Sequence, residues 1–363
     1  MGSIVTGNFN TGVIMVEMGL LDWARLLLGM VLFLGPGYCI STFLPNYSAF
    51  DRTKTVLLSF VFTVSFWAAL FAWLQPAGVR LSAAPVVALT LLGWLIGIFR
   101  QYRAKKFHFP SFRWRDSAAR LLLWLLLASI AAAGLWTVRG RVVAPGSDSY
   151  HHSLIPQLIM EQGRLLENYQ PVTDQIVTFT YHFGFHITVA VLGWLSGVQT
   201  YQIVMILGVL WIALSALSTA FLTESFTGSR WGGLAAAAVT GVVCVFPAAM
   251  LNWGRFPQVE GLIFLTVFIG LIREQPGPAW NWRRAAIFGL LAAGLGFTHY
   301  RAALMTIASV AALLIALWIE GSLRQIQNLK SRILEFLGSG RRRRYFLRPG
   351  PCTRFLPGSK GTR

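Results

Sequence analysis

The chain has little charge, few acidic residues and few cysteines. Only 12% of its 363 residues are charged, against about 25% in ordinary globular proteins. So little polar surface cannot cover a water-soluble fold of this size, which excludes the common soluble enzyme classes. The three cysteines, Cys39, Cys244 and Cys352, lie far apart without a CxxC or His-spaced pattern. They indicate neither a disulfide framework nor a zinc site.

The uncharged parts of the chain are long apolar segments. Hydrophobic residues make up 55% of the chain, and the mean hydropathy is +0.59. The blocks are about 17 to 24 residues long, the length that a helix needs to cross a bilayer core of roughly 30 Å. A segment in lipid must satisfy its backbone N–H and C=O groups internally, so these blocks are helical. The sequence therefore predicts an all-α protein, a polytopic bundle of transmembrane helices.

About nine spans are predicted from the apolar windows. They lie at 24–44, 55–75, 83–99, 119–137, 201–223, 231–250, 257–273, 284–298 and 301–320. The segment 182–198 is barely long enough to cross. We expect it to lie along the membrane interface, because only then do all basic loops fall on one side.

Basic residues decide the orientation. The loop 100–120 is rich in Arg and Lys, and we expect it to be cytoplasmic. The N-terminus is then outside, the C-terminus is cytoplasmic, and the loop 138–200 is an exoplasmic loop with juxtamembrane helices. We expect an integral protein of a prokaryotic plasma membrane, with the eukaryotic endoplasmic reticulum as the alternative.

Three parts follow from this pattern. Residues 1–118 form a three-span scaffold with its basic loop, and 119–323 form the membrane core. Residues 324–363 are a basic tail with eleven Lys or Arg against one Glu. The net charge of +18 gathers beside predicted spans, which indicates contact with membrane lipids and no nucleic-acid partner. The tail is either disordered or the remnant of a frame disruption in a longer gene.

Asp148 is the first candidate for chemistry. It follows a turn made by Pro145 and Gly146, just after a predicted span. It is placed to cap a helix that begins at Ser149. The alternative is a general base at a site on the membrane surface. Tyr150, His151 and His152 follow at once and are candidates for binding a substrate.

Two arginines interrupt apolar blocks on the predicted exoplasmic side. Arg255 precedes one span, and Arg301 follows His299 and Tyr300 at the start of another. An arginine binds phosphate through two N–H groups at once. The alternative is that both side chains reach the lipid headgroups. Because they lie away from the cytoplasmic basic loops, we favour substrate binding by Arg255, His299, Tyr300 and Arg301.

Weaker candidates complete the set. Asp174 is a second loop carboxylate, for which a solvated position is favoured. The alternatives are that it binds a divalent cation together with Asp148, or that it serves as an alternative base. His182 and His186 are spaced i, i+4, as metal ligands can be, but the HExxH pattern is absent. We predict no metal site there. Glu260 lies inside a predicted span, where a carboxylate is a functional candidate.

The run Asp148-Ser-Tyr150-His151 resembles the first exoplasmic loop of the GT-C superfamily of membrane glycosyltransferases, in particular that of oligosaccharyltransferase catalytic subunits. The segment Tyr181-His182-Phe-Gly-Phe-His186 is similar to the second juxtamembrane helix of protein-mannosyltransferase-like members. The resemblance covers residues 119–310 through short motifs.

The resemblance implies inverting transfer of a sugar from a polyprenyl-phosphate donor to a glycan, lipid or protein acceptor, with Asp148 as base. We predict no cofactor, with a divalent cation as the alternative. The chain departs from the family in placing three spans before the acidic loop and in lacking a large soluble domain. It also has fewer spans than usual. The alternatives are a multi-pass transporter or lipid flippase, with polar residues at mid-membrane, and an inactive truncated scaffold.

Overall fold

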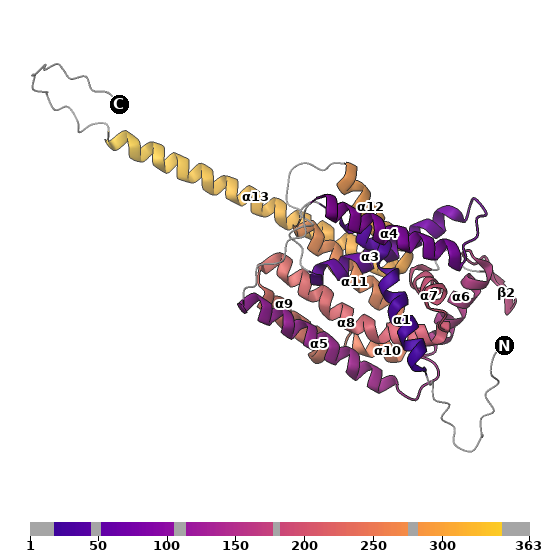
Figure 1. The fold of residues 1–363 in the computed structure, drawn as a ribbon. Helices are drawn as coiled ribbons and strands as arrows, with labels where there is room; N and C mark the ends of the chain where they lie inside the picture. Colours follow the sequence, from indigo (N-terminus) through magenta and orange to yellow (C-terminus); the bar gives the residue numbers. More distant parts are fainter. Residues whose placement is uncertain (1–17, 45–51, 105–113, 177–181, 275–281, 343–363) are drawn as a thin grey trace, which may run out of the picture. The chain divides into compact units, whose positions relative to one another are not determined.

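The computed structural model describes residues 18–44, 52–104, 114–176, 182–274 and 282–342 (Figure 1). The helices are α1 (Leu20–Phe33), α2 (Gly35–Ser41), α3 (Arg52–Leu74), α4 (Ala83–Arg103), α5 (Trp114–Val138), α6 (Asp148–Gln162), α7 (Gly184–Ser196), α8 (Thr200–Thr227), α9 (Arg230–Ala238), α10 (Ala248–Trp253), α11 (Phe256–Glu274), α12 (Trp282–Thr298) and α13 (Tyr300–Arg342). A π-helical turn, η2 (Val239–Val243), continues α9, and the strands β1 (Asn168–Tyr169) and β2 (Thr173–Ile176) form one antiparallel hairpin. The chain divides into two compact units, Met1–Ala308 and Ser309–Arg363.

The prediction of an all-α membrane bundle is confirmed at this level. In the described part of the chain, seven helices are long and apolar enough to cross a membrane. They are Leu20–Ser41, Thr53–Leu74, Ala83–Arg103, Ser117–Val138, Thr200–Thr227, Phe256–Glu274 and Tyr300–Ser331. All seven coincide with predicted spans.

The other two predicted spans correspond to shorter helices. The window 231–250 contains α9 and η2, which together end at Val243, followed by α10. The window 284–298 is occupied by α12, which has 17 residues. The count of nine spans therefore stays a prediction, as do the divisions at residues 118 and 323.

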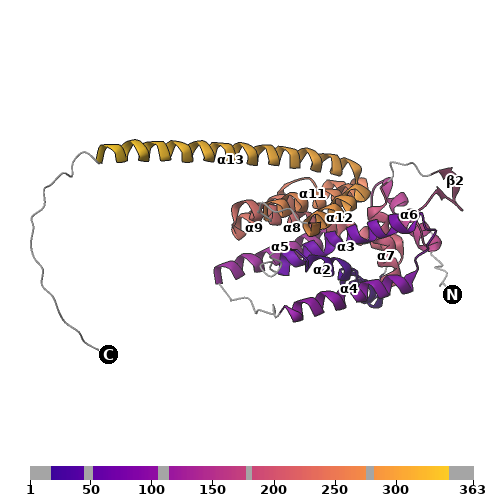
Figure 2. The same cartoon turned by 90° about the horizontal axis from the view of Figure 1, so that it is seen from above.

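The centre of the first unit is formed by α8 and α3. Of the most apolar stretch in each helix, 83% is buried in α8 and 67% in α3, against 22% in α4 and in α5. Helix α8 packs against α11, α9 and α5, and these helices run side by side in Figures 1 and 2. The exposed apolar faces of α4 and α5 suit contact with lipid.

Helix α7 differs from the expected interfacial helix. It has 13 residues, about 20 Å at 1.5 Å per residue, which is too short to cross a bilayer core. It does not lie on a surface, however, because α1, α3, α6 and α8 pack around it and eleven of its residues are buried. The reason is its sequence: a helix that is apolar on every side is stable only when it is enclosed.

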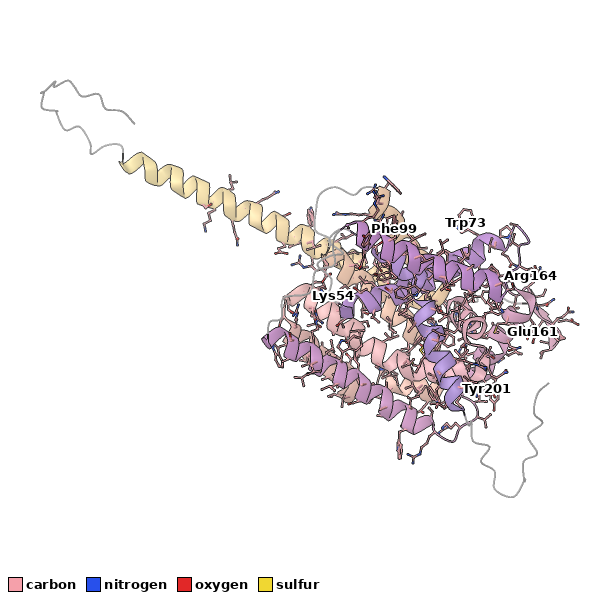
Figure 3. All side chains as sticks on the ribbon, viewed as in Figure 1. Lys54, Trp73, Phe99, Glu161, Arg164 and Tyr201 are labelled. Carbon is pink, nitrogen blue, oxygen red and sulfur yellow. The ribbon has the colours of Figure 1, made fainter. Side chains whose placement is uncertain are left out.

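One end of the first unit holds two buried or half-buried ion pairs. Arg120 of α5 donates through both terminal nitrogens to the carboxylate of Glu224 at the end of α8, at 2.9 Å each. Lys54 of α3 pairs with Glu274 at the end of α11. Figure 3 shows Lys54 at the side of the unit opposite to Glu161 and Arg164, so this end faces away from the loop region that contains the site.

Candidate functional site

A cavity of about 400 Å³ lies where the ends of several helices meet. Its walls come from the first turns of α6, the β1–β2 hairpin, the residues before α7, the start of α11, and the junction of α12 with α13. Six carboxylate, guanidinium or imidazole side chains line it: Asp148, His151, His152, His182, Arg255 and His299. All six are residues that the sequence singled out, although they span 152 positions from first to last. The fold thus gathers them in one place.

Two glycines join the walls of this cavity. Gly146 and Gly254 have φ of +94° and +69°, in the left-handed region that favours glycine. A Cβ on Gly146 would lie 2.4 Å from the backbone nitrogen of Gly254, so the two backbones touch. This contact holds the start of α6 against the start of α11.

The contact brings together the carboxylate and the guanidinium that the sequence predicted to act on one side. Arg255 Nε lies 3.4 Å from Asp148 Oδ2. The side chain of Asp148 is 42% exposed and that of Arg255 is 50% exposed. Both groups are therefore accessible to a molecule that enters the cavity.

Asp148 is not the N-cap of α6. It is the first residue of the helix, and the residue at the cap position is Ser147, which makes no side-chain capping bond. The capping interpretation assumed that the helix begins at Ser149, one residue later. A carboxylate in the first turn still gains from the helix dipole, but its pairing with Arg255 is the feature that the sequence alone could not supply.

A pair of imidazoles lies behind the cavity wall. Nδ1 of His152 is 2.9 Å from Nε2 of His186. His152 lines the cavity and is 7% exposed, whereas His186 is fully buried. The rings of Phe185 and Phe256 pack against His152. Burial, helped by the nearby charge of His182, lowers the pKa of His152 to about 3, so this ring is neutral at pH 7.

A second group of packed rings contributes another part of the cavity wall. The rings of His182 and His299 are 4.9 Å apart between centroids, and His299 stacks on Tyr300. The backbone N–H of Ala302 donates to Nδ1 of His299 at 3.3 Å. Burial, with the charges of His182, Arg301 and Arg255, lowers the pKa of His299 to about 4. It too is a neutral donor or acceptor at pH 7.

The spacing of His182 and His186 does not make a metal pair here. His186 turns to His152, and His182 packs on His299. Over the described ranges, no group of three or more His, Cys, Asp or Glu side chains is arranged to hold a metal ion.

Six of the predicted residues do not line the cavity: Tyr150, Asp174, His186, Glu260, Tyr300 and Arg301. Tyr150 is 70% exposed. Arg301 Nε donates to the hydroxyl of Tyr300 at 3.0 Å.

Asp174 is also on the wrong face to meet Asp148. Its neighbours Thr173 and Gln175 line the cavity, and alternate residues of a strand point to opposite faces. The carboxylate of Asp174 instead accepts a hydrogen bond from the side chain of Gln170. Asp174 is exposed, as the solvated alternative predicts, and its carboxylate does not face Asp148.

Glu260 lies below the cavity in α11. It is fully buried, and Oε1 is 3.5 Å from the hydroxyl of Thr188 in α7. Within the described residues, Oε2 has no hydrogen-bond partner. The sequence found this residue by its position in an apolar block, but not its neighbour Thr188.

Several lining residues were missed. Tyr169, Thr173 and Gln175 come from the β1–β2 hairpin, and Gln258 comes from the first turn of α11. A two-residue and a four-residue strand are too short for an alternating pattern to be recognised. Gln258 offered a usable signal, because it is a polar side chain in the first turn of an apolar helix, three residues after Arg255.

The cavity unites a carboxylate, a cation and neutral imidazoles. Arg255 keeps N–H groups beyond Nε with which to bind an anion. Asp148 can accept a proton, and the ring of Tyr169 offers an aromatic surface. These are groups that suit proton removal beside a negatively charged leaving group.

Comparison with known proteins gives a family but no activity. The model of DUF6541, described as a family of unknown function, matches residues 30–340. No curated protein matches the chain, and no solved structure does so either.

Proposed function

This chain belongs to the DUF6541 family, and because that family has no assigned function, we propose one from the cavity: a membrane glycosyltransferase. It transfers a sugar from a polyprenyl-phosphate donor to a glycan, lipid or protein acceptor on the exoplasmic side, with inversion at the anomeric carbon. This places it in the GT-C superfamily, which its SDSYHH loop resembles.

The observation that carries the proposal is the pair of Asp148 and Arg255 in the cavity wall. In an inverting transfer, a base takes the proton of the acceptor hydroxyl while a phosphate leaves from the opposite face of the sugar. Asp148 is the base. Arg255 neutralises the phosphate as its negative charge develops, and a guanidinium does this well where water is scarce.

The rest of the cavity supports a sugar as the bound group. Its volume of about 400 Å³ is within the range of small-molecule sites, roughly 300 to 1,000 Å³. Tyr169, Gln175 and Gln258 add an aromatic ring and amide groups to the wall. Such groups bind the apolar face and the hydroxyls of a hexose or pentose.

The helix ends support nine spans with the cavity outside. The ends of α3 and α12 and the starts of α11 and α13 lie on the cavity side, as does the loop after α5. The opposite end of the unit carries the starts of α3, α5 and α12 with their basic residues. Basic loops are cytoplasmic, so we place the N-terminus outside, the C-terminus inside and the protein in a prokaryotic plasma membrane.

Sugar transfer by purified protein tests the proposal. The protein is supplied with several polyprenyl-phosphate sugars, and the native chain is compared with Asp148→Asn and with Asp22→Asn. Asp22 is a matched control, because its side chain is 40% exposed, pairs with Arg25 in the first turn of α1 and does not line the cavity. Transfer by the native chain and the control, with loss in Asp148→Asn, is the expected result. Equal transfer by all three would remove Asp148 as the base.

A transporter is the second candidate, and Glu260 is the observation that favours it. A fully buried carboxylate in a candidate span is typical of proton- or ion-coupled transport. Under this alternative, substrate uptake into proteoliposomes is abolished by Glu260→Gln and survives Asp148→Asn. A protein that neither transfers sugar nor transports is the inactive scaffold.

A further inference from the structure

A second cavity, of about 280 Å³, lies beside the first and takes no part in the reaction described above. Every side chain that lines it is polar: two arginines, two glutamates and three amides. The charged ones are Arg80, Glu161, Arg164 and Glu167, of which Glu161 and Arg164 are seen at one edge of the first unit in Figure 3. The wall of the first cavity differs, because it includes leucine, valine and proline side chains. We call the second one the polar cavity.

One strand separates the two cavities. Asn168 and Gln170 line the polar cavity, and Tyr169 between them lines the first, because alternate residues of an extended chain point to opposite faces. Helix α6 also serves both cavities, with Asp148 in its first turn and Glu161 in its last. A chain molecule that passes the hairpin therefore contacts both.

A glycine contact shapes the polar cavity. Gly163 follows α6 with φ of +69°, and its carbonyl accepts a hydrogen bond of 2.7 Å from the N–H of Leu81. A Cβ on Gly163 would lie 2.4 Å from the carbonyl oxygen of Leu81 and 3.1 Å from Cβ of Arg80. This contact holds the loop between α3 and α4 against the end of α6, and it brings Arg80 to the cavity wall.

Much of the charge in the wall already has a partner, but Arg80 does not. Arg164 Nη1 lies 3.2 Å from Glu167 Oε1, and Oε1 of Glu161 accepts a hydrogen bond from Gln157 at 2.9 Å. Arg80 is exposed, and within the described ranges it makes no hydrogen bond or ion pair. All of its N–H groups are therefore open to a ligand.

The composition of this wall selects the kind of ligand. Two arginines and two glutamates cancel in formal charge, so the wall favours neither a small anion nor a small cation. None of the described residues that line it is apolar, so a lipid chain or the side chains of a peptide would find no apolar pocket. Guanidinium groups only donate hydrogen bonds, carboxylates only accept them, and hydroxyl groups do both. A neutral molecule with many hydroxyl groups therefore matches this wall.

We propose that the polar cavity binds a neutral glycan, and that this glycan is the acceptor of the sugar. Its reacting hydroxyl lies in the first cavity beside Asp148, and sugar units further along the chain bind Arg80 and Glu161 beyond the hairpin. The proposal rests on the function proposed above, and it selects the glycan from the three acceptor classes. The polar cavity only binds, and it adds no chemical step.

Binding of free glycans tests the polar cavity without any donor. Tetrasaccharides of glucose, mannose, galactose and xylose are added to the full chain in lipid nanodiscs, since sugar-headed detergents would compete, and binding is measured by saturation-transfer NMR. We expect at least one to bind, with affinity at least about tenfold lower in Arg80→Gln and in Glu161→Gln, because each change removes a charged hydrogen-bonding group. Both side chains are exposed, so both variants should fold.

Arg141→Gln is the matched control. It changes an exposed arginine in the loop after α5 that lines neither cavity. If no tetrasaccharide binds, or if Arg80→Gln and Glu161→Gln bind it as well as the control does, the proposal is wrong. If a hexapeptide of Gly, Ser and Asn binds there in place of the tetrasaccharides, the occupant is a peptide and the proposal is wrong as well.

Acceptor length then separates this proposal from the proposed function. The tetrasaccharide that binds is compared as acceptor with its monosaccharide. We expect the ratio of the two kcat/KM values to fall about tenfold in Arg80→Gln, through KM of the tetrasaccharide, because the change removes binding that is equal in the ground state and the transition state. An equal fall for both acceptors would contradict the proposal. If tetrasaccharides bind but no sugar is transferred, the glycan site stands and the glycosyltransferase fails; if sugar passes only to a lipid or a peptide, the reverse holds.

Discussion

Arg255 Nε lies 3.4 Å from Asp148 Oδ2, across a backbone contact between Gly146 and Gly254. The two charged residues are 107 positions apart in the chain, and each stands at the start of a helix. Their distance depends on the glycines, because a side chain on either would separate the two helix starts.

Replacing Gly146 tests this dependence. The added methyl of Gly146→Ala would meet the backbone of Gly254 at 2.4 Å and would also require φ of +94°. We expect a loss of stability of more than about 1 kcal/mol and loss of transfer. Thermal unfolding in detergent and the transfer assay measure the two effects. Gly289→Ala in α12 is the control, since open space surrounds its Cβ position; a comparable loss there would contradict the argument.

Replacing Arg255 separates charge from shape. Arg255→Lys keeps the charge and loses the planar pair of N–H groups that binds phosphate at two points. We expect transfer to fall at least about tenfold in Arg255→Lys and further in Arg255→Ala. Stability should change by no more than about 1 kcal/mol, because an exposed ion pair contributes little. Titration with donor, with kcat and KM measured separately, checks the first expectation, and unchanged kinetics in Arg255→Ala would refute it.

The ion pair of Arg120 and Glu224 should behave differently. Its side chains are only 16% and 6% exposed, and both guanidinium nitrogens bind the carboxylate. We expect Glu224→Gln to lower the free energy of unfolding by roughly 3 to 5 kcal/mol, since the buried guanidinium loses its counter-charge. The double change Arg120→Met with Glu224→Leu should recover most of this loss. Thermal or denaturant unfolding of the native protein, Glu224→Gln and the double variant measures these differences. An equal loss of stability in the two variants would contradict the explanation.

Stability should fall in mild acid because of His152. Its folded-state pKa of about 3 is below the ordinary 6.5, so between these values the unfolded chain binds more protons than the folded protein. The sign of the linkage is then fixed: stability is full above about pH 6.5 and decreases as the pH falls. One such group accounts for about 2 kcal/mol between pH 6.5 and pH 5. Unfolding temperatures of the native protein and of His152→Gln at both pH values measure the difference, which should be smaller in the variant.

Membrane orientation is open to a labelling test. In a background with Cys39, Cys244 and Cys352 changed to Ser, single cysteines replace Val172 of the cavity hairpin or Arg283 of α12. Both positions are exposed. In intact cells, a membrane-impermeant maleimide should label Val172→Cys, whereas Arg283→Cys should react only after permeabilisation. Labelling of both from outside would reject the assigned orientation.

Local properties of the sequence were enough to predict the long helices. An apolar run of 20 residues is helical in lipid whatever its neighbours, so the windows around α3, α8 and α11 coincide with helices. The shorter α12 and the broken α9 fell within predicted windows, but hydropathy does not locate the break after Val243. Helix α7 was placed at a surface because composition does not say which helices enclose a segment.

The sequence predicted many residues of the site, but not the contacts between them. The distribution of basic loops predicted that Asp148 and Arg255 lie on one side of the membrane. Their pairing, however, depends on the contact between the backbones of two glycines. The bond between His152 and His186 depends on how α6 packs on α7, and no spacing within either helix encodes it. The direction of the Asp174 side chain could not be predicted, because the faces of a four-residue strand are defined only once the strand itself is known.

The enclosed helix α7 has a consequence for how the protein is made. Thirteen residues are too few to leave the insertion machinery as an independent span, and α8, one of the helices that enclose α7, is synthesised after it. We therefore expect α7 to enter its place between the other helices only after α8 has been inserted. His186 and Thr188, the α7 side chains that contact His152 and Glu260, would then reach their partners late in assembly.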